Sequence, residues 1–535
     1  MQFDRITRAR ATVANAARPR VLTAAVAAAL AVALAGCAVG PDYKRPSVDI
    51  PASYKEAAEG WKVAQPADQQ DRGAWWTIYN DPQLNALEDK LDASNQSIAQ
   101  FAAAYRQARA LVAEARSAYF PVISASADGS RSRSPSRRFS GSVTGGGGGT
   151  TSSLSSSGTI SNSYSLSLDA TWEPDLWGKV SRTVAGQQAG QLAAAADLAN
   201  ARLSAQATLA QTYFNIRSLD AQQKLLDDTV AAYQRSLTLT QNRYAQGVAA
   251  RSDVIQAQTQ LQSAQASAID NGVARAQNEH AIAVLIGEPA STFSLPPAPL
   301  DAVPPPVPAQ LPSALLERRP DIASAERKAA AANEQIGVAI AAFFPTLTLS
   351  ASGGYESSVF SQLLTAPSRF WTLGPQLAQT IFDAGLRRAQ TDAARAIYDQ
   401  DVATYRQTVL AAFQDVEDNL ASLRILEQEI AVQQQAVQSA QQALDIVTNQ
   451  YKSGTVGYLN VLTAQTTAFT AEQKLASIAG QRMVSSAGLV KALGGGWDVS
   501  QMSRETGDVA APAAVPASAP SAPVAPVART SATTG

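Results

Sequence analysis

One cysteine carries the clearest chemistry in this chain of 535 residues. Cys37 closes the run Leu34-Ala35-Gly36-Cys37, at the end of an apolar stretch that begins at Val21. A thiolate is the nucleophile that acyl transfer needs, and the two small residues before it let a processing enzyme approach the backbone. The pattern predicts that Cys37 becomes the first residue of the mature chain and carries N-acyl and S-diacylglycerol groups.

Residues 1–36 read as a lipoprotein signal peptide. The apolar run is too short to span a bilayer, but it suits the hydrophobic region of a secretory signal. The positive segment in front of it contains Arg5, Arg8, Arg10, Arg18 and Arg20. The alternative, a free cysteine buried in a core, has no core-like sequence around it. An intramolecular disulfide is excluded because the chain has one cysteine.

Other catalytic and metal-binding signatures are missing from the sequence. His280 is the single histidine and stands in a helical pattern, so we expect no metal site built from His and Cys. The glycine run Gly145–Gly149 lacks the Gly-Lys-Ser/Thr ending of a phosphate-binding loop. The net charge of −1 gives no basic footprint for nucleic acid. We therefore expect neither an enzyme, nor a cofactor other than the covalent lipid.

The periodicity of apolar residues predicts mainly helix with a few strands. Residues 82–118 have helical spacing after a capping Asp81, and 122–127 begin a strand. Residues 129–162 are rich in Ser and Gly, which predicts a long exposed loop. The clearest strand follows, because Tyr164, Leu166 and Leu168 alternate with serines.

A long helical hairpin comes next, and then the whole pattern repeats. Helices are predicted over about 179–245 and 252–287, at roughly 100 Å for the first. At an offset of 207 residues, Tyr244 matches Tyr451, Gly247 matches Gly454, and Val254 matches Val461. The chain is thus predicted to be an internal duplication of helix, β-hairpin, long helix, turn and helix.

Four strands per chain have a structural consequence. Backbone groups cannot stay unpaired in hydrocarbon, so a sheet that crosses a bilayer must close, and the smallest such barrels use about eight strands. We therefore expect three copies to contribute twelve strands, with serines toward an aqueous lumen and Tyr164, Leu166 and Leu168 toward lipid. The alternative from the residues alone is a soluble β-layer, or a lipid-anchored periplasmic coiled-coil scaffold without a pore.

Several motifs resemble those of the TolC-type outer-membrane efflux factors, specifically the OprM/NodT lipoprotein branch. The resemblance covers roughly Cys37 to Trp497. The motifs are Gly40-Pro41-Asp42-Tyr43-Lys44-Arg45-Pro46, Trp75-Trp76 with Asp81-Pro82-Gln83-Leu84, Trp172-Glu173-Pro174-Asp175-Leu176-Trp177-Gly178, and Arg318-Arg319-Pro320-Asp321-Ile322.

The resemblance implies a fold, a function and partners. The fold is a TolC-like homotrimer that is mainly α, in which a membrane β-barrel of twelve strands continues into a long α-helical barrel with a mixed equatorial domain. The function is the outer-membrane channel of a tripartite efflux system, a passive exit duct for small molecules such as drugs or other toxic compounds. The partners are a periplasmic adaptor, an inner-membrane pump of the RND type and outer-membrane lipid.

The resemblance also places the periplasmic tips and a gate. This chain departs from the family pattern Leu-x-x-x-Asp-Ala-Gln-Arg. Leu459 is kept, but Thr463 and Thr466 replace the two charged residues. We therefore expect a constriction set by Tyr458 and Leu459 rather than by ion pairs; the alternative is that these residues only pack the turn. The candidate tip residues are Gly247, Arg251, Asp253, Gly454, Tyr458, Leu459, Asn460 and Thr463.

The sequence divides into six segments. They are the signal peptide 1–36, a lipid-anchored equatorial segment 37–81, a first efflux repeat 82–287 with a β-hairpin over 119–173, a proline-rich equatorial linker 288–320, a second repeat 321–493 with a β-hairpin over 343–382, and an Ala/Pro-rich tail 498–535 predicted to be disordered. Position 38 is alanine and not the aspartate that retains many lipoproteins at the inner membrane. This favours sorting of the chain to the outer membrane.

Overall fold

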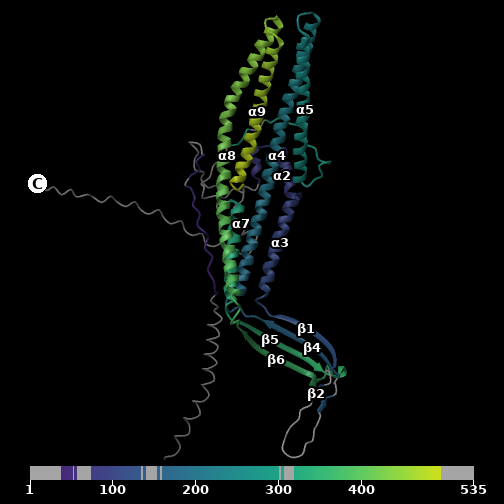
Figure 1. Ribbon diagram of the computed structural model, residues 1–535, viewed down its shortest axis with the longest axis vertical. Helices are drawn as coiled ribbons and strands as arrows, with labels where there is room; N and C mark the ends of the chain where they lie inside the picture. Colours follow the sequence, from purple (N-terminus) through teal and green to yellow (C-terminus); the bar gives the residue numbers. More distant parts are fainter. Residues whose placement is uncertain are drawn as a thin grey trace, which may run out of the picture.

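The computed structural model describes residues 38–51, 53–56, 74–133, 137–139, 154–156, 160–300, 303–305 and 318–495. The predicted signal peptide, Cys37 and the tail 498–535 lie outside these residues. The described chain is an elongated body of long helices with a sheet at one end (Figure 1). No helix in the described ranges has both the length and the apolar character that crossing a membrane requires.

The first half of the chain begins with short helices at mid-height. They are the 3-10 helix η1 Trp75–Tyr79, followed by α2 Pro82–Ser94 and α3 Gln96–Ser117. Asp81 caps α2, because its side chain accepts bonds from the backbone N–H groups of Gln83 and Leu84 at 2.9 and 3.2 Å. The single helix expected over 82–118 is therefore wrong: it breaks at Asn95, whose side chain caps α3.

Two long helical hairpins follow the strands. The first consists of α4 Lys179–Ala245 and α5 Arg251–Leu285, and the second of α8 Leu386–Ser453 and α9 Tyr458–Ala492. α7 Pro320–Ala341 precedes the second pair of strands. Leu386 follows Lys179 by 207 residues and Tyr458 follows Arg251 by the same 207. The predicted duplication is confirmed in the helices themselves.

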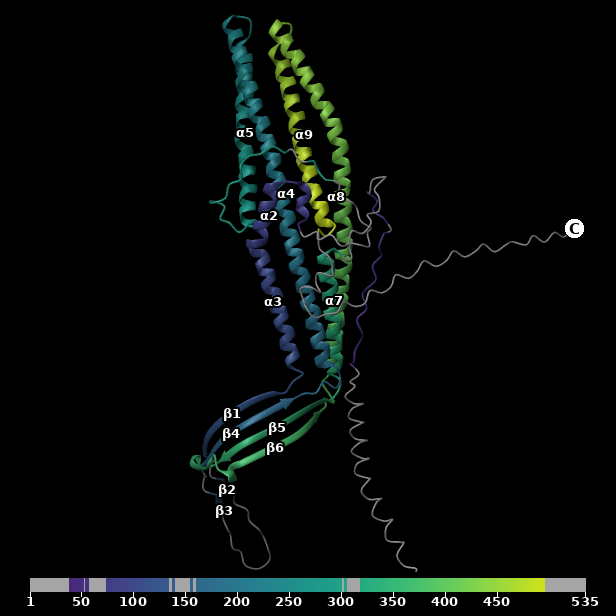
Figure 2. The same ribbon diagram turned by 180° about the vertical axis from the view of Figure 1, so that it is seen from behind.

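The helices form a layer that is four helices wide. Toward the tips the order of contact is α8, α9, α4 and α5, and toward the sheet it is α8, α7, α4 and α3. Both views show this arrangement (Figures 1 and 2). α4 and α8 run the whole length, while shorter helices lie end to end beside them. One edge of the layer is therefore α8, and the other is α5 continued by α3.

The sheet has four antiparallel strands in the order β1, β4, β5 and β6. Their bounds are Val122–Arg133, Ile160–Trp172, Thr346–Ser357 and Arg369–Ala378. β1 pairs with β4 and β5 with β6, which confirms both predicted hairpins, and β4 pairs with β5 across the two repeats.

The predicted loop over 129–162 is partly wrong. β1 extends to Arg133 and β4 begins at Ile160, and their register continues to the pair Arg133 with Ile160. Two further short strands, β2 Arg137–Phe139 and β3 Leu154–Ser156, pair within the stretch. Strand pairing satisfies the backbone, so a serine- and glycine-rich composition does not prevent a ladder there.

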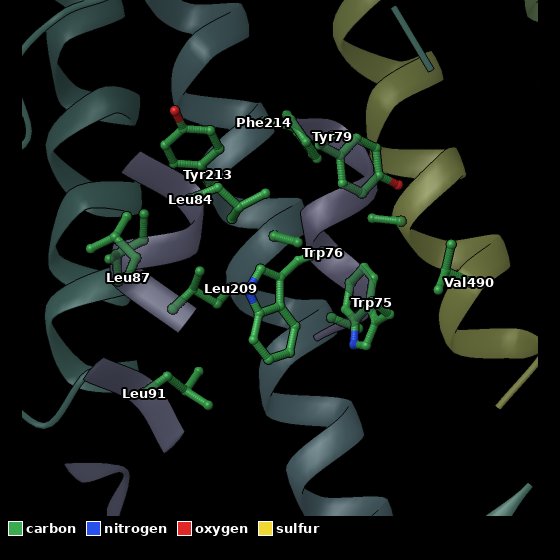
Figure 3. Packing of buried hydrophobic residues seen from close by; sticks show 14 of the residues in the cluster. Trp75, Trp76, Tyr79, Leu84, Leu87, Leu91, Leu209, Tyr213, Phe214 and Val490 are labelled. Carbon is green, nitrogen blue, oxygen red and sulfur yellow. The ribbon is translucent and has the colours of Figure 1, made fainter. Parts of the chain in front are cut away.

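The largest core lies at mid-height and joins the two repeats. Trp76, Leu84 and Leu209 pack there against the ring pair of Tyr213 and Phe214 (Figure 3). Val490 of α9 contributes from the second repeat. Burial of large apolar side chains is the main favourable term in folding, so this cluster holds the layer together at its centre.

Glu88 is the exception in this core. Its residue is fully buried in α2, and neither carboxyl oxygen has a hydrogen-bond partner among the described residues. Burial, followed by the nearby charges of Asp92 and Asp89, raises the pKa of Glu88 to about 9. The side chain is therefore neutral at pH 7.

Candidate functional site: the sheet faces, the chain edges and the helical tips

The register of the strands separates one apolar and one polar face of the sheet. On the apolar face Ala125 stands opposite Leu168, Leu168 opposite Gly353, and Gly353 opposite Trp371. The large members of this face are open in the single chain: Leu168 is 62% exposed and Trp371 is 75% exposed. A contiguous exposed apolar face of this kind marks a contact with a membrane or with another protein.

The opposite face is polar and hydrogen-bonded across strands. Ser126 and Ser167 bond through their hydroxyl groups at 2.8 Å, and the Ser167 hydroxyl donates to the Asp169 carboxylate at 2.8 Å. Ser132 and Ser161 make a similar bond at 2.8 Å nearer the far end. This ladder matches an aqueous surface, so the two faces of the sheet suit two different solvents.

Both sides of the molecule end in unpaired edges. In the described part of the sheet, β1 and β6 each have a neighbour on one side only. β1 follows α3 at one edge of the helical layer, and β6 precedes α8 at the other edge. A strand edge presents free N–H and C=O groups, which native proteins cover or pair. The chain is thus open along the same two edges in the sheet and in the helices.

The hairpin tips are built by two equivalent glycines. Gly247 and Gly454 both have left-handed backbones, with φ of 77° and 80°, which end α4 and α8 and favour glycine. Arg251 begins α5, and Asp253 stands in its first turn. Leu459, Asn460 and Thr463 are exposed on the first turns of α9. The structure thus brings the predicted tip residues to the same end of the molecule.

Tyr458 does not fit the predicted constriction. It is 2% exposed, whereas the neighbouring Leu459 is 62% exposed. Its ring packs edge to face on Tyr451 with the centroids 5.7 Å apart, and burial raises its pKa. The prediction that Tyr458 narrows a pore is wrong, because the ring fills the space between the two hairpins. Leu459 stays a candidate.

Arg243 was not found from the sequence. Its guanidinium lies over the Tyr451 ring at 4.6 Å from the centroid, and it donates to the Lys452 carbonyl at 3.1 Å. It therefore ties the end of α4 to the end of α8. A cation over an aromatic face contributes about 0.5–1 kcal/mol at an exposed site. No local pattern could have indicated this, because Arg243 and Tyr451 lie on different hairpins.

Apart from these surfaces, the described residues offer no metal-binding cluster and one polar cavity whose cation is already paired. Among the described residues, no cluster of His, Cys, Asp and Glu could hold a metal ion. A polar cavity of about 210 Å³ lies between α4, α8 and α9 near the start of α7. Arg319 lines it, but its guanidinium already bonds to Asp321 and Asp415 at 2.7 and 3.1 Å. The positive charge of Arg319 is therefore already paired with carboxylates of the same chain.

An amphipathic sheet joined to long helical hairpins is the architecture of a channel-forming membrane protein. The sequence profile of the outer membrane efflux protein family matches residues 87–288 and 311–495. The chain belongs to this family. The resemblance seen in the sequence is therefore confirmed, and the chain is placed at the outer membrane.

Individual relatives agree with this assignment. The probable efflux pump outer membrane protein TtgC of Pseudomonas putida is 32% identical over 474 residues, which are 88% of this chain and 95% of that protein. The solvent efflux pump outer membrane protein SrpC of Pseudomonas putida is 33% identical over 476 residues, 88% of this chain and 97% of that protein. These relatives are efflux proteins rather than enzymes.

The fold agrees with a solved channel. The outer-membrane channel OprN has a TM-score of 0.76 and 28% sequence identity, over 86% of this chain and all of the OprN chain. The TolC-like fold predicted from the sequence is confirmed.

Proposed function

We propose that three copies of this chain form the outer-membrane exit duct of a tripartite efflux system. The duct is passive, and small molecules enter it from an inner-membrane pump of the RND type through a periplasmic adaptor. Acylated Cys37 anchors each chain to the outer membrane, and the helices extend into the periplasm. The observation that carries the proposal is the four-stranded sheet with one apolar face, one polar face and two open edges.

Matching apolar stripes on the two edges support a closed ring. On α5, Ile255 and Ile269 are exposed and 14 residues apart, and on α8 the exposed Val432 and Ile446 have the same spacing. Ile255 and Ile446 lie near the tip, while Ile269 and Val432 lie about two heptads further from it. Residues two heptads apart share one helix face. The α5 edge of one chain therefore fits the α8 edge of the next, in a head-to-tail contact that can close.

Disulfide trapping tests the ring. We expect the double variant Ile269→Cys and Val432→Cys to give covalently linked dimers and trimers in oxidised membranes, because each chain then carries one cysteine on each of its two edges. Cys37 does not compete, since in the proposal its sulfur carries the diacylglycerol group as a thioether and no free thiol remains. The matched control is Ile269→Cys with Ile446→Cys, whose partners differ in height by about 21 Å at 1.5 Å per residue. Larger ladders, or equal linking in the control, would contradict a closed trimer.

Conductance separates a duct from a lipid-anchored scaffold. Purified trimers in planar bilayers are expected to conduct ions, because the serine face of the sheet surrounds water. A scaffold without a pore would conduct nothing even when the trimer is intact. Loss of trimers without loss of conductance would also count against the duct.

The tips are proposed to meet the adaptor and to narrow the duct at Leu459. We expect Leu459→Ala to increase the open probability of single channels several-fold, since it removes an exposed apolar side chain and disturbs no packing. Asn460→Ala, the next exposed residue, serves as the control. Unchanged opening in Leu459→Ala, measured in planar bilayers, rejects Leu459 as a gate residue.

A further inference from the structure

Two motifs that lie about 140 residues apart in the chain meet at the junction of the sheet and the helices. The first is the start of the described chain, Ala38–Tyr43, which we call the N-terminal strap. The second is Trp177-Gly178 with the first turn of α4. The purple segment that contains the strap lies along the outside of α8 and α7, and its first residues lie at this junction (Figure 2).

The strap and its contact surface fit together through glycine. The Val39 backbone N–H donates to the Trp177 carbonyl at 3.2 Å. Gly178 has φ of 77°, and a Cβ there would lie 2.7 Å from the Cα of Ala38. Gly40 has φ of 107°, and a Cβ on it would lie 2.6 Å from the Cα of Gly337. Any side chain at Gly178 or Gly40 would push the strap away.

Arg182 holds the strap from inside the protein. Its guanidinium is buried and donates to the Asp42 carboxylate at 3.1 Å and to the Gly40 carbonyl at 3.4 Å. The second terminal nitrogen of the guanidinium, Nη1, donates to the Glu334 carboxylate of α7 at 2.9 Å. The Asp42 carboxylate is exposed, so the pair with Glu334 is the stronger of the two. Arg182 therefore joins the strap, α4 and α7 in one contact.

The junction has the composition of a membrane interface. Trp177 stacks on Phe344 with centroids 4.9 Å apart, and its indole N–H donates to the Pro345 carbonyl at 2.7 Å. Phe120 and Phe382 are largely exposed at the ends of neighbouring segments. Aromatic side chains gather where a membrane protein passes from hydrocarbon to water. The first residues of the strap lie at this level.

We propose that Gly178, Arg182 and Gly337 form a seat for the mature N-terminus, and that Arg182 is its positioning residue. The seat fixes Ala38 at the aromatic level, so lipid on Cys37 enters the bilayer beside the apolar face of the sheet. The inference rests on the proposed acylation of Cys37 and on the membrane placement of the sheet. The ligand class is the acyl chains of the protein's own anchor together with the surrounding phospholipid.

Hydrogen–deuterium exchange and photo-crosslinking test the seat in acylated trimers in phospholipid nanodiscs. Arg182→Gln is expected to speed exchange in the strap at least ten-fold, with exchange along the rest of α4 unchanged. A small diazirine side chain at position 39 is expected to link to residues near Trp177 in the parent protein and to lipid in the variant. Arg182→Lys keeps the charge and should recover part of the protection.

Two further variants keep the result decisive. Gly178→Ala displaces the strap and leaves the Arg182 pair with Glu334 intact, so it decides the matter if Arg182→Gln does not fold. Cys37→Ser, exported behind a signal peptide that is cleaved without lipid addition, removes the lipid but should leave strap protection unchanged, which separates failure of acylation from failure of the seat. Parent-like exchange and crosslinks in both Arg182→Gln and Gly178→Ala would overturn the proposal.

Discussion

Replacing Glu88 with glutamine is expected to raise the free energy of unfolding by about 3 kcal/mol at pH 7. The carboxyl group is fully buried without a partner, and its pKa is raised to about 9 from an ordinary value of 4.5. An unfolded chain loses this proton easily, while the folded chain must keep it. The difference favours unfolding, and glutamine removes it because it has no proton to lose.

The sign of the pH dependence follows from the same shift. A raised carboxyl pKa gives a contribution that is fully present below pH 4.5 and is lost as the pH rises toward 9. The parent protein should therefore become less stable across this window relative to Glu88→Gln. Melting temperatures of both proteins at pH 5, 7 and 9 measure the effect.

An exposed glutamate away from this cluster provides the control for Glu88. Glu114→Gln makes the same substitution at an exposed position of α3, so we expect a change within about 0.5 kcal/mol and no common pH trend. A gap between parent and Glu88→Gln that stays constant from pH 5 to 9 would show that Glu88 does not titrate as described.

The second large effect is expected on the apolar face of the sheet. Leu168→Arg places a cation where the proposed lipid contact lies, which costs roughly 2–4 kcal/mol per chain near the bilayer centre. Because every copy in the ring carries the change, we expect assembly in the outer membrane to fall sharply. The heat-resistant oligomer in membrane fractions measures it.

The matched control puts the same residue on the other face. Ser165 stands opposite Asp128 on one side and Glu356 on the other, so arginine there meets acidic neighbours and water. Ser165→Arg is expected to assemble normally. Equal loss in both variants would mean that the sheet does not contact lipid through its Leu168 face.

Long regular elements could be predicted because local signals mark their ends. Gly178 and Gly247 delimit α4, and the prediction of 179–245 agrees with the structure. The break at Asn95 could not be seen in the periodicity, since Leu91 and Ile98 stay in phase across it. Its cause is tertiary: the Asn95 and Ser94 side chains bond to carbonyls at the end of α5, about 190 residues later in the chain.

The candidate site was predictable to a similar extent. The alternation around Leu168 was enough to assign the two sheet faces, because a strand has a period of two. Tyr458 was assigned wrongly because its burial comes from the other hairpin. The contacts of Arg182 with the strap could not be predicted either, because they join residues about 140 positions apart in the chain. Both motifs that form the seat were nevertheless visible in the sequence.

The unbroken course of α4 and α8 makes each of them a lever. A helix of 67 residues is about 100 Å long, so a tilt of about 5° at the sheet would displace its far end by roughly 9 Å. α3 and α7 stop at mid-height and cannot transmit such a rotation. A small tilt at the membrane end would therefore become a large displacement at the helical tips. Conversely, a large displacement of the tips would produce only a small tilt at the membrane end.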